Sequence, residues 1–152
     1  MPTSQQEMED ILLNVLSLGA SDLHLGVGYK PTVRIDGVLM PLNQFAILTA
    51  ERSIELISVI LGDRKDAFME KKEIDFSYAF KYKARFRANV FFEKGFVSVA
   101  LRHILSKIRT IEELNLSTIL HRISGFKQGF VLLTGPSGHG KSTTLAKNIL
   151  LP

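Results

Sequence analysis

Eight consecutive residues have the types and the spacing of a phosphate-binding loop. Residues 135–142 read GPSGHGKS and match the pattern G-x-x-x-x-G-K-[ST] at every fixed position. Glycines let the backbone curl so that several N–H groups point at phosphate oxygens, and the N-terminus of a following helix adds partial positive charge there. In such a loop the lysine, here Lys141, reaches the outer phosphates, and the Ser142 hydroxyl takes one position on Mg²⁺. The spacing therefore predicts a nucleotide-binding site.

The predicted site takes in the loop and the first residues after it. Lys141 is the candidate catalytic residue and Ser142 the candidate metal ligand. His139 occupies a variable position of the pattern, and we interpret its side chain as solvent-facing, without a catalytic role. The candidate nucleotide-binding residues are Gly135, Ser137, Gly138, His139, Gly140, Lys141, Ser142 and Thr143.

Two elements must position this loop. The apolar run of residues 130–133 lies directly before it and is typical of a strand buried on both faces. Residues 141–151 follow as a helical stretch. A strand before the loop and a helix after it form the context that the motif requires.

Composition excludes several classes of protein. The chain has 152 residues, 45% of them hydrophobic and 22% charged, which indicates a globular protein rather than a disordered one. It has no Cys, so disulfides and Cys-based zinc sites are excluded. No apolar run approaches the roughly 18 residues of a membrane span, and the acidic N-terminus is unlike a secretory signal. We expect a soluble, cytoplasmic protein.

Positive charge is concentrated in one stretch. Residues 81–109 carry eight Lys and Arg residues against the single acid Glu93. Such a stretch indicates an anionic partner or an acidic neighbouring surface, but a solvated strand face would show the same pattern. Arg85 and Arg87 are two residues apart and therefore share one face of a strand.

The rest of the chain predicts helices packed on an antiparallel sheet. Capping signals at Ser4, Thr49 and Asp63 each begin a helix, and Asp36-Gly37 predicts a tight hairpin turn. Alternating apolar residues predict strands near 22–27, 32–35, 38–42, 74–80, 84–92 and 96–104. Beyond residue 106 a second capping box at 110–113 and a helix from Ser117 to about Gly125 lead to the loop. The fold class is α/β, with one domain over residues 1–105 and a second over 106–152.

Several further motifs accompany the loop in a fixed order. They are the segments 20–25 (ASDLHL), 33–37 (VRIDG), 74–78 (IDFSY), 84–89 (ARFRAN), 100–102 (ALR), 110–114 (TIEEL), and 133–146, which contains the loop. This series resembles the type IV pilus retraction ATPases, the motors of twitching motility, within the wider type II and type IV secretion ATPase family. The resemblance covers essentially the whole chain.

The resemblance implies an architecture and a function. It implies a PAS-like N-terminal domain followed by the beginning of a RecA-like ATPase domain, with ATP and Mg²⁺ as cofactors. It implies a hexameric ring in the cytoplasm, peripheral to the inner membrane, where a pilus platform protein would be its partner. Arginines of the N-terminal domain approach the nucleotide in that family, so Arg85, Arg87 and Arg102 are further candidate catalytic residues.

The 152 residues contain only part of the machinery that the resemblance implies. No acidic Walker B strand and no catalytic Glu follow the loop within them. A lone strand and helix also cannot cover both faces of residues 130–133. We therefore expect that these residues by themselves neither hydrolyse ATP nor bind it tightly.

Three other interpretations were weighed. The chain could be a non-catalytic interaction module of a pilus or secretion assembly, docking through its sheet. Nucleic-acid binding is disfavoured, because Phe86 and Phe92 fall on the strand face opposite Arg85 and Arg87. Asp22 and His24 share a face, but they have no visible third ligand, so we expect structural hydrogen bonding rather than a metal site.

Overall fold

The computed structural model describes residues 3–104, 110–136 and 140–149. The chain divides into two units, Met1–Leu105 and Ser106–Pro152. None of the helices in the described ranges is long and apolar enough to cross a membrane.

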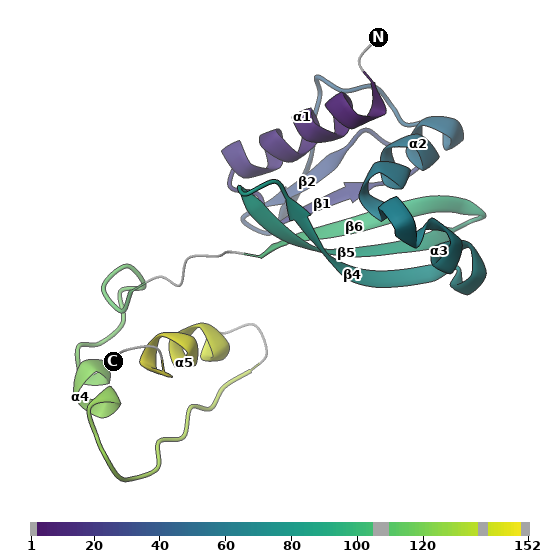
Figure 1. Cartoon of the computed structure of the whole chain (residues 1–152). Coiled ribbons are helices and arrows are strands. Elements are labelled where there is room, and N and C mark those ends of the chain that lie inside the picture. The colour runs from purple at the N-terminus through teal and green to yellow at the C-terminus, as the bar shows by residue number, and fades with distance from the viewer. Residues whose placement is uncertain (1–2, 105–109, 137–139, 150–152) are drawn as a thin grey trace. The chain divides into compact units, whose positions relative to one another are not determined.

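The first unit contains one six-stranded sheet (Figure 1). Every strand pair is antiparallel, and the strands lie in the order β3-β2-β1-β6-β5-β4. The predicted antiparallel sheet is confirmed. The strands are β1 (Asp22–Leu25), β2 (Thr32–Ile35), β3 (Val38–Pro41), β4 (Glu73–Phe80), β5 (Ala84–Glu93) and β6 (Phe96–Ile104).

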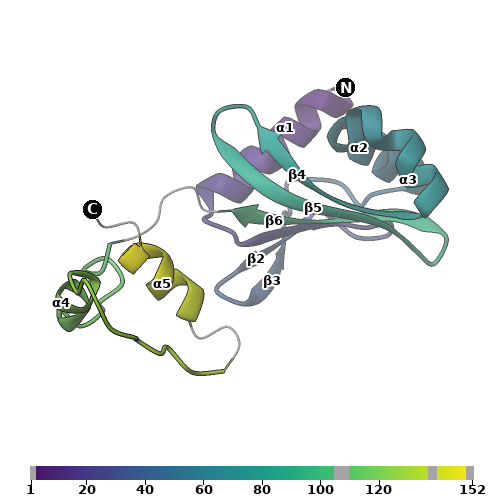
Figure 2. The same cartoon turned by 60° about the horizontal axis from the view of Figure 1, so that its bottom comes forward.

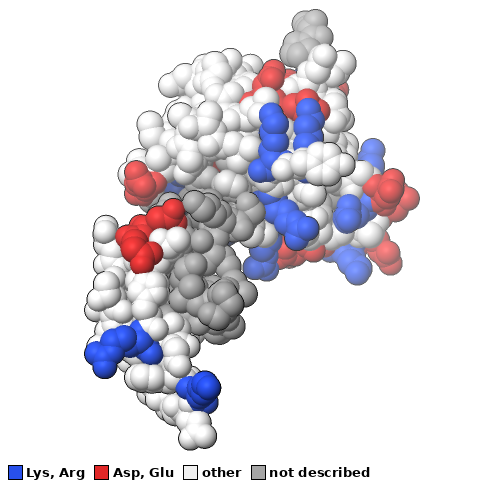
Figure 3. Space-filling model, turned by 60° about the vertical axis from the view of Figure 1, so that its left-hand side comes forward, with Lys and Arg blue, Asp and Glu red and all other residues white. Residues whose placement is uncertain are grey.

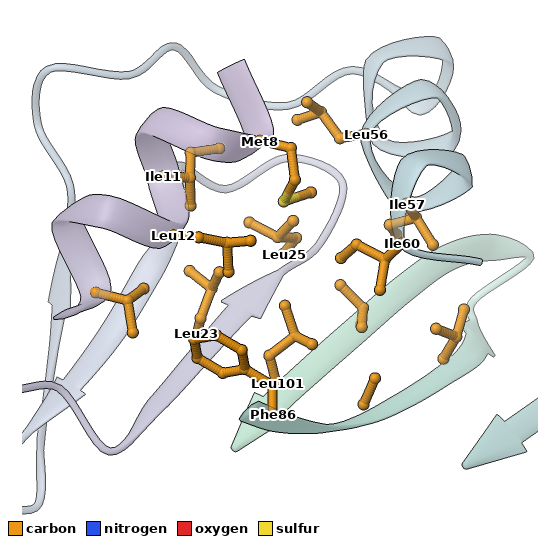
Figure 4. Close-up of a cluster of buried hydrophobic side chains, with 14 of the residues drawn as sticks. Met8, Ile11, Leu12, Leu23, Leu25, Leu56, Ile57, Ile60, Phe86 and Leu101 are labelled. Carbon is orange, nitrogen blue, oxygen red and sulfur yellow. The ribbon is translucent and has the colours of Figure 1, made fainter. Parts of the chain in front are cut away.

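Helices cover one face of this sheet and leave the other face open (Figure 2). They are α1 (Ser4–Ser17), α2 (Ala50–Leu61) and α3 (Lys65–Lys71), with a single 3₁₀ turn, Gly62–Arg64, before α3. The core lies between helices and sheet, as expected for strands whose side chains alternate between two faces (Figure 4). Its largest fully buried side chains include Met8, Ile11, Leu12, Leu23, Leu56, Phe68, Phe86 and Leu101.

Two of the predicted helix caps are wrong. The cap of α1 is Thr3 rather than Ser4, because Thr3 and Gln6 form the capping box while the Ser4 hydroxyl donates to Glu55 of α2 at 3.1 Å. Asp63 caps nothing, since it lies inside the 3₁₀ turn that runs directly into α3. The Thr49 cap is confirmed, with its hydroxyl accepting from the Arg52 N–H at 3.2 Å.

The predicted hairpin between β2 and β3 is confirmed. Asp36 and Gly37 both have positive φ, at 48° and 84°. A two-residue turn of the primed type requires positive φ at both positions, and Asp and Gly are the residues that adopt it with least strain.

The second unit contains two short helices, α4 (Ile119–Ser124) and α5 (Lys141–Ile149). The predicted capping box is present, since Thr110 and Glu113 exchange hydrogen bonds of 2.9 and 3.1 Å. It is followed by turns rather than by a helix, and α4 begins at Ile119 instead of Ser117.

The buried strand predicted for residues 130–133 does not form. These residues have no regular secondary structure and are exposed, with Phe130 at 86% and Leu132 at 70%. The physical reason is pairing. A strand that is apolar on both faces needs neighbouring strands and covering helices, and in the described part of the chain the only sheet belongs to the first unit.

Candidate nucleotide-binding loop and arginine-bearing sheet face

The predicted loop leads directly into α5. The helix begins at Lys141, and its first intrahelical hydrogen bond joins the Thr144 N–H to the Gly140 carbonyl at 2.9 Å. Gly140 has a φ of 77°, a conformation that side chains rarely adopt, so glycine is needed at this step into the helix. Ser137, Gly138 and His139 lie outside the described residues.

Backbone groups at the start of α5 suit an anionic ligand. Because the helical bonds begin at Thr144, the N–H groups of Lys141, Ser142 and Thr143 have no partner within the helix. These N–H groups carry the partial positive charge of the helix N-terminus. The side chains of Ser142 and Thr143 are exposed, so the Ser142 hydroxyl is accessible to a metal ion. Nucleotide phosphates and Mg²⁺ both fit the donors and acceptors found here.

The Lys141 side chain lies over its own loop. Its ammonium group donates to the Pro136 carbonyl. This contact keeps the charged end beside the loop backbone rather than extended into solvent, which is where a lysine that binds the outer phosphates must be.

The three candidate arginines of the first unit share the open face of the sheet. Arg87 of β5 is directly opposite Arg102 of β6, and Arg102 is directly opposite Asp22 of β1. Arg85 lies one step further along β5 on the same face. Residues directly opposite each other in antiparallel strands have neighbouring side chains, so the sheet brings Arg87 and Arg102 together although 15 residues separate them in sequence.

Arg102 is held by a nearly buried carboxylate. Its Nε donates to Asp22 Oδ1 at 2.9 Å, and Asp22 is only 8% exposed. The other carboxylate oxygen accepts from the Ser21 hydroxyl at 2.8 Å and lies 3.6 Å from Nε of Arg34. Burial alone would raise the pKa of Asp22, but the hydrogen bonds from Ser21 and Arg102 outweigh it and lower that pKa. Asp22 is therefore a charged anchor in the sheet.

Arg87 is held by a more exposed carboxylate. Its Nε lies 3.1 and 3.0 Å from the two Asp75 oxygens, and its Nη2 donates to Oδ2 at 2.5 Å. These bonds lower the pKa of Asp75 and raise that of Arg87. Both side chains remain largely in solvent, at 68% exposure for Arg87 and 41% for Asp75.

Arg85 and the turn before it form an exposed basic segment. Lys81, Lys83 and Arg85 are all exposed. Lys81 pairs with Glu9 of α1 at 2.8 Å, whereas Arg85 has no ion pair with any residue in the described ranges. Figure 3 shows Lys and Arg side chains gathered on the surface of the first unit, with Asp and Glu among them.

His24 lies in the same hollow of the open face as Arg87 and Arg102. The hollow has a volume of about 290 Å³ and is also lined by Asp22, Asp75, Asn89 and Ala100. The His24 Nε2 atom is buried and has no hydrogen-bond partner among the described residues. Burial lowers the pKa of His24, which keeps the ring neutral near pH 7.

Asp22 and His24 both line the hollow of the open face. In the ranges that the structure describes, no three His, Asp or Glu side chains come together to hold a metal ion. Asp22 makes the structural hydrogen bonds expected of it, but the expectation is wrong for His24, whose buried Nε2 has no hydrogen-bond partner among the described residues.

The structure thus groups the candidate residues into a loop set and an arginine set, one in each unit. Sequence reasoning missed Asp75 as the partner of Arg87. The alternation of β4 places Asp75 on the polar face, but only the β4–β5 register, which sets Asp75 opposite Asn89 and beside Arg87, shows the contact.

Comparison with known proteins finds relatives along most of the chain. No protein-family model matches the chain. The type IV pilus retraction ATPase PilT of Pseudomonas aeruginosa is 41% identical over 142 residues, which is 92% of this chain and 41% of that protein. The resemblance to the type IV pilus retraction ATPases is therefore confirmed.

Solved structures agree with the likeness to these retraction ATPases. The crystal structure of the pilus retraction motor PilT with bound ADP is 38% identical and has a TM-score of 0.78, over 93% of this chain and 41% of that one. The ATPase DotB of Legionella pneumophila is 27% identical with a TM-score of 0.79, again over 93% and 41%. Both likenesses confirm the mixed α/β fold class. The chain spans about two fifths of the length of these relatives, which fits the N-terminal portion expected from the sequence.

Proposed function

We propose that residues 1–152 are the ATP-binding portion of a P-loop motor ATPase that powers type IV pilus retraction. The observation that carries the proposal is the loop of residues 135–142, whose Lys141 and Ser142 are the first two residues of α5. The 41% identity to a retraction ATPase and the 38% identity to a motor with bound ADP support it.

Each part of the site has a proposed role. The N–H groups at the start of α5 bind phosphate oxygens, Lys141 binds the outer phosphates, and Ser142 binds Mg²⁺. The remaining loop residues, Ser137, Gly138 and His139, contribute backbone contacts. Arg85, Arg87 and Arg102 contribute positive charge to the phosphates, because guanidinium groups bind phosphate oxygens through paired N–H donors.

The assembly proposed for the whole protein follows its relatives. We propose a cytoplasmic homo-hexamer, peripheral to the inner membrane, that acts on a pilus platform protein. The N-terminal unit is proposed to be PAS-like and the loop-bearing unit to be the start of a RecA-like domain, with the division near residues 105–106.

Residues 1–152 by themselves are proposed to bind ATP weakly and to be inactive in hydrolysis. Residues 130–133, which precede the loop, are exposed and belong to none of the strands described, so no described strand pairing fixes the start of the loop. An unanchored loop must be ordered by the nucleotide, and that ordering reduces the affinity.

Titration of the chain with Mg-ATP, followed by backbone NMR signals, tests this function. We expect shifts at the start of α5 with a millimolar dissociation constant, and Lys141→Ala should abolish them. Lys127→Ala, which removes an exposed lysine of the same unit outside the loop, is the matched control and should leave them unchanged. Micromolar binding would contradict the proposed weakness. Shifts that survive Lys141→Ala would contradict the site. Loss of assembly on charge reversal at Arg85 and Arg87, with Lys141→Ala harmless, would instead favour a non-catalytic interaction module.

A further inference from the structure

The two carboxylates that pair with arginines on the open face, Asp22 and Asp75, differ in burial and in their other contacts. Asp22 is nearly buried; its Oδ1 accepts from Arg102, and its Oδ2 accepts from the Ser21 hydroxyl and lies 3.6 Å from Nε of Arg34. Asp75 is 41% exposed, and Arg87 is its one ion-pair partner among the residues that the structure describes. Surface ion pairs contribute little to stability, because solvent screens them and the side chains lose freedom. Both arginines are exposed, at 68% for Arg87 and 73% for Arg102, so the difference lies in their partners. Asp75 can move away from Arg87, whereas Ser21 and Arg34 keep Asp22 in place beside Arg102.

Asp75 occupies the part of Arg87 that a phosphate would use. It accepts from Nε and from Nη2, which are parallel donors on one edge of the guanidinium. Carboxylates and phosphates are both recognised by paired donors of this kind. The two ligands therefore compete for one edge, and a phosphate group, with more negative charge than a carboxylate, is the stronger competitor.

The neighbouring arginine explains why a carboxylate lies there. Arg87 and Arg102 are directly opposite each other on adjacent strands, where like charges destabilise a sheet. Asp22 and Asp75 each offset one of these charges. A bound phosphate could take over the role of Asp75 without leaving the arginines unbalanced.

We propose that Asp75 is a competitor built into the fold, which binds Arg87 until a phosphate-bearing ligand displaces it, whereas Asp22 keeps Arg102 in place throughout. This inference rests on the proposed function, which assigns these arginines to nucleotide phosphates. Asp75 thereby sets the affinity of the arginine face for phosphate and disfavours anions of lower charge.

The test is a titration of the 152-residue chain with inorganic pyrophosphate, followed by the NMR signal of the Arg87 Nε–H group. We expect Asp75→Asn to tighten binding by about fivefold, the effect of removing one unit charge a few ångströms away in a water-like dielectric. Without pyrophosphate, the Arg87 Nε–H signal of the Asp75→Asn variant should already differ from that of wild type, because the carboxylate that bonds this group is gone. Both side chains are exposed, so the variant is expected to fold, and circular dichroism would confirm this.

Glu73→Gln is the matched control. Glu73 lies on the same strand and the same face as Asp75, and its replacement by Gln removes the same charge. Its carboxylate accepts from Asn89 at 3.0 Å rather than from an arginine. Glu73→Gln should tighten pyrophosphate binding less than twofold. In an Arg87→Ala background, where binding is read at the Arg102 Nε–H signal, Asp75→Asn should produce no more than the effect of Glu73→Gln. This double-mutant cycle separates competition for Arg87 from the general change in charge.

Three results would overturn the inference. Equal effects of Asp75→Asn and Glu73→Gln would show that only net charge matters. Weaker binding by Asp75→Asn would show that Asp75 positions Arg87 instead of competing for it. If pyrophosphate shifts none of the Arg85, Arg87 and Arg102 signals, then the assignment of these arginines to phosphate fails, and the inference fails with it. The first two results leave the proposed function intact.

Discussion

Replacing Asp22 by Asn should destabilise the first unit by about 1.5–3 kcal/mol near neutral pH, the range for a hydrogen bond to a charged group. The carboxylate accepts from Ser21 at 2.8 Å and from Arg102 at 2.9 Å, and it lies 3.6 Å from Nε of Arg34. An amide retains one oxygen acceptor but loses the charge that offsets two arginines. Because Arg102 is 73% exposed at its side chain, we expect a loss nearer the lower end of the range.

The size of this loss should depend on pH in a defined direction. The folded-state pKa of Asp22 is lowered from its ordinary value of 3.8. The charged carboxylate therefore contributes its full stability above pH 3.8, and the contribution is lost as the pH falls through the lowered folded-state pKa. Wild type and Asp22→Asn should consequently converge in stability at acid pH.

Urea unfolding followed by tyrosine fluorescence measures this quantity in the first unit alone. The chain has no Trp, and its three tyrosines, Tyr29, Tyr78 and Tyr82, all lie in that unit. Asp36→Asn, in the β2–β3 turn, removes a carboxylate that makes no ion pair with any described residue and should change stability by less than about 0.5 kcal/mol. A difference in the free energy of unfolding between wild type and Asp22→Asn that stays constant from neutral to acid pH would refute the reasoning. A loss of stability no larger than that of Asp36→Asn would refute it as well.

Two further predictions concern a turn and a carboxylate. Gly37→Ala should lower the free energy of unfolding by about 1 kcal/mol through backbone strain alone, because φ is 84° and no atom lies within 4 Å of the added Cβ. Urea unfolding measures this loss, and an unchanged unfolding midpoint would contradict the prediction. The pKa of Glu112 is lowered to about 2 by its own backbone N–H, by the Thr110 side chain and by His121, whose Nε2 lies 2.7 Å from Oε1. His121→Ala should raise that pKa without restoring its ordinary value of 4.5, since the first two contacts remain. A carboxyl-carbon NMR titration measures the change, and an unaltered pKa would exclude the His121 contact in solution.

Local signals in the sequence determined the elements of the first unit and the identity of the loop. The turn at Asp36-Gly37, the Thr49 cap and the alternation of β5 each depend on residues a few positions apart, so they can be predicted without the fold. The loop pattern is equally local, because its glycines, Lys141 and Ser142 all lie within one stretch of eight residues.

Only the tertiary structure decided what each element contacts. The pairing of β1 with β6 sets Asp22 opposite Arg102, and no short-range signal encodes a contact between residues 80 positions apart. The cap of α1 is Thr3 rather than Ser4, and the Ser4 hydroxyl donates instead to Glu55, which lies 51 residues away in α2. Residues 130–133 show the converse, since their apolar pattern predicts a strand that cannot form without neighbours. Hydrogen-bond pairing between distant segments is the physical reason in each case, because it satisfies backbone and side-chain groups that a local pattern leaves open.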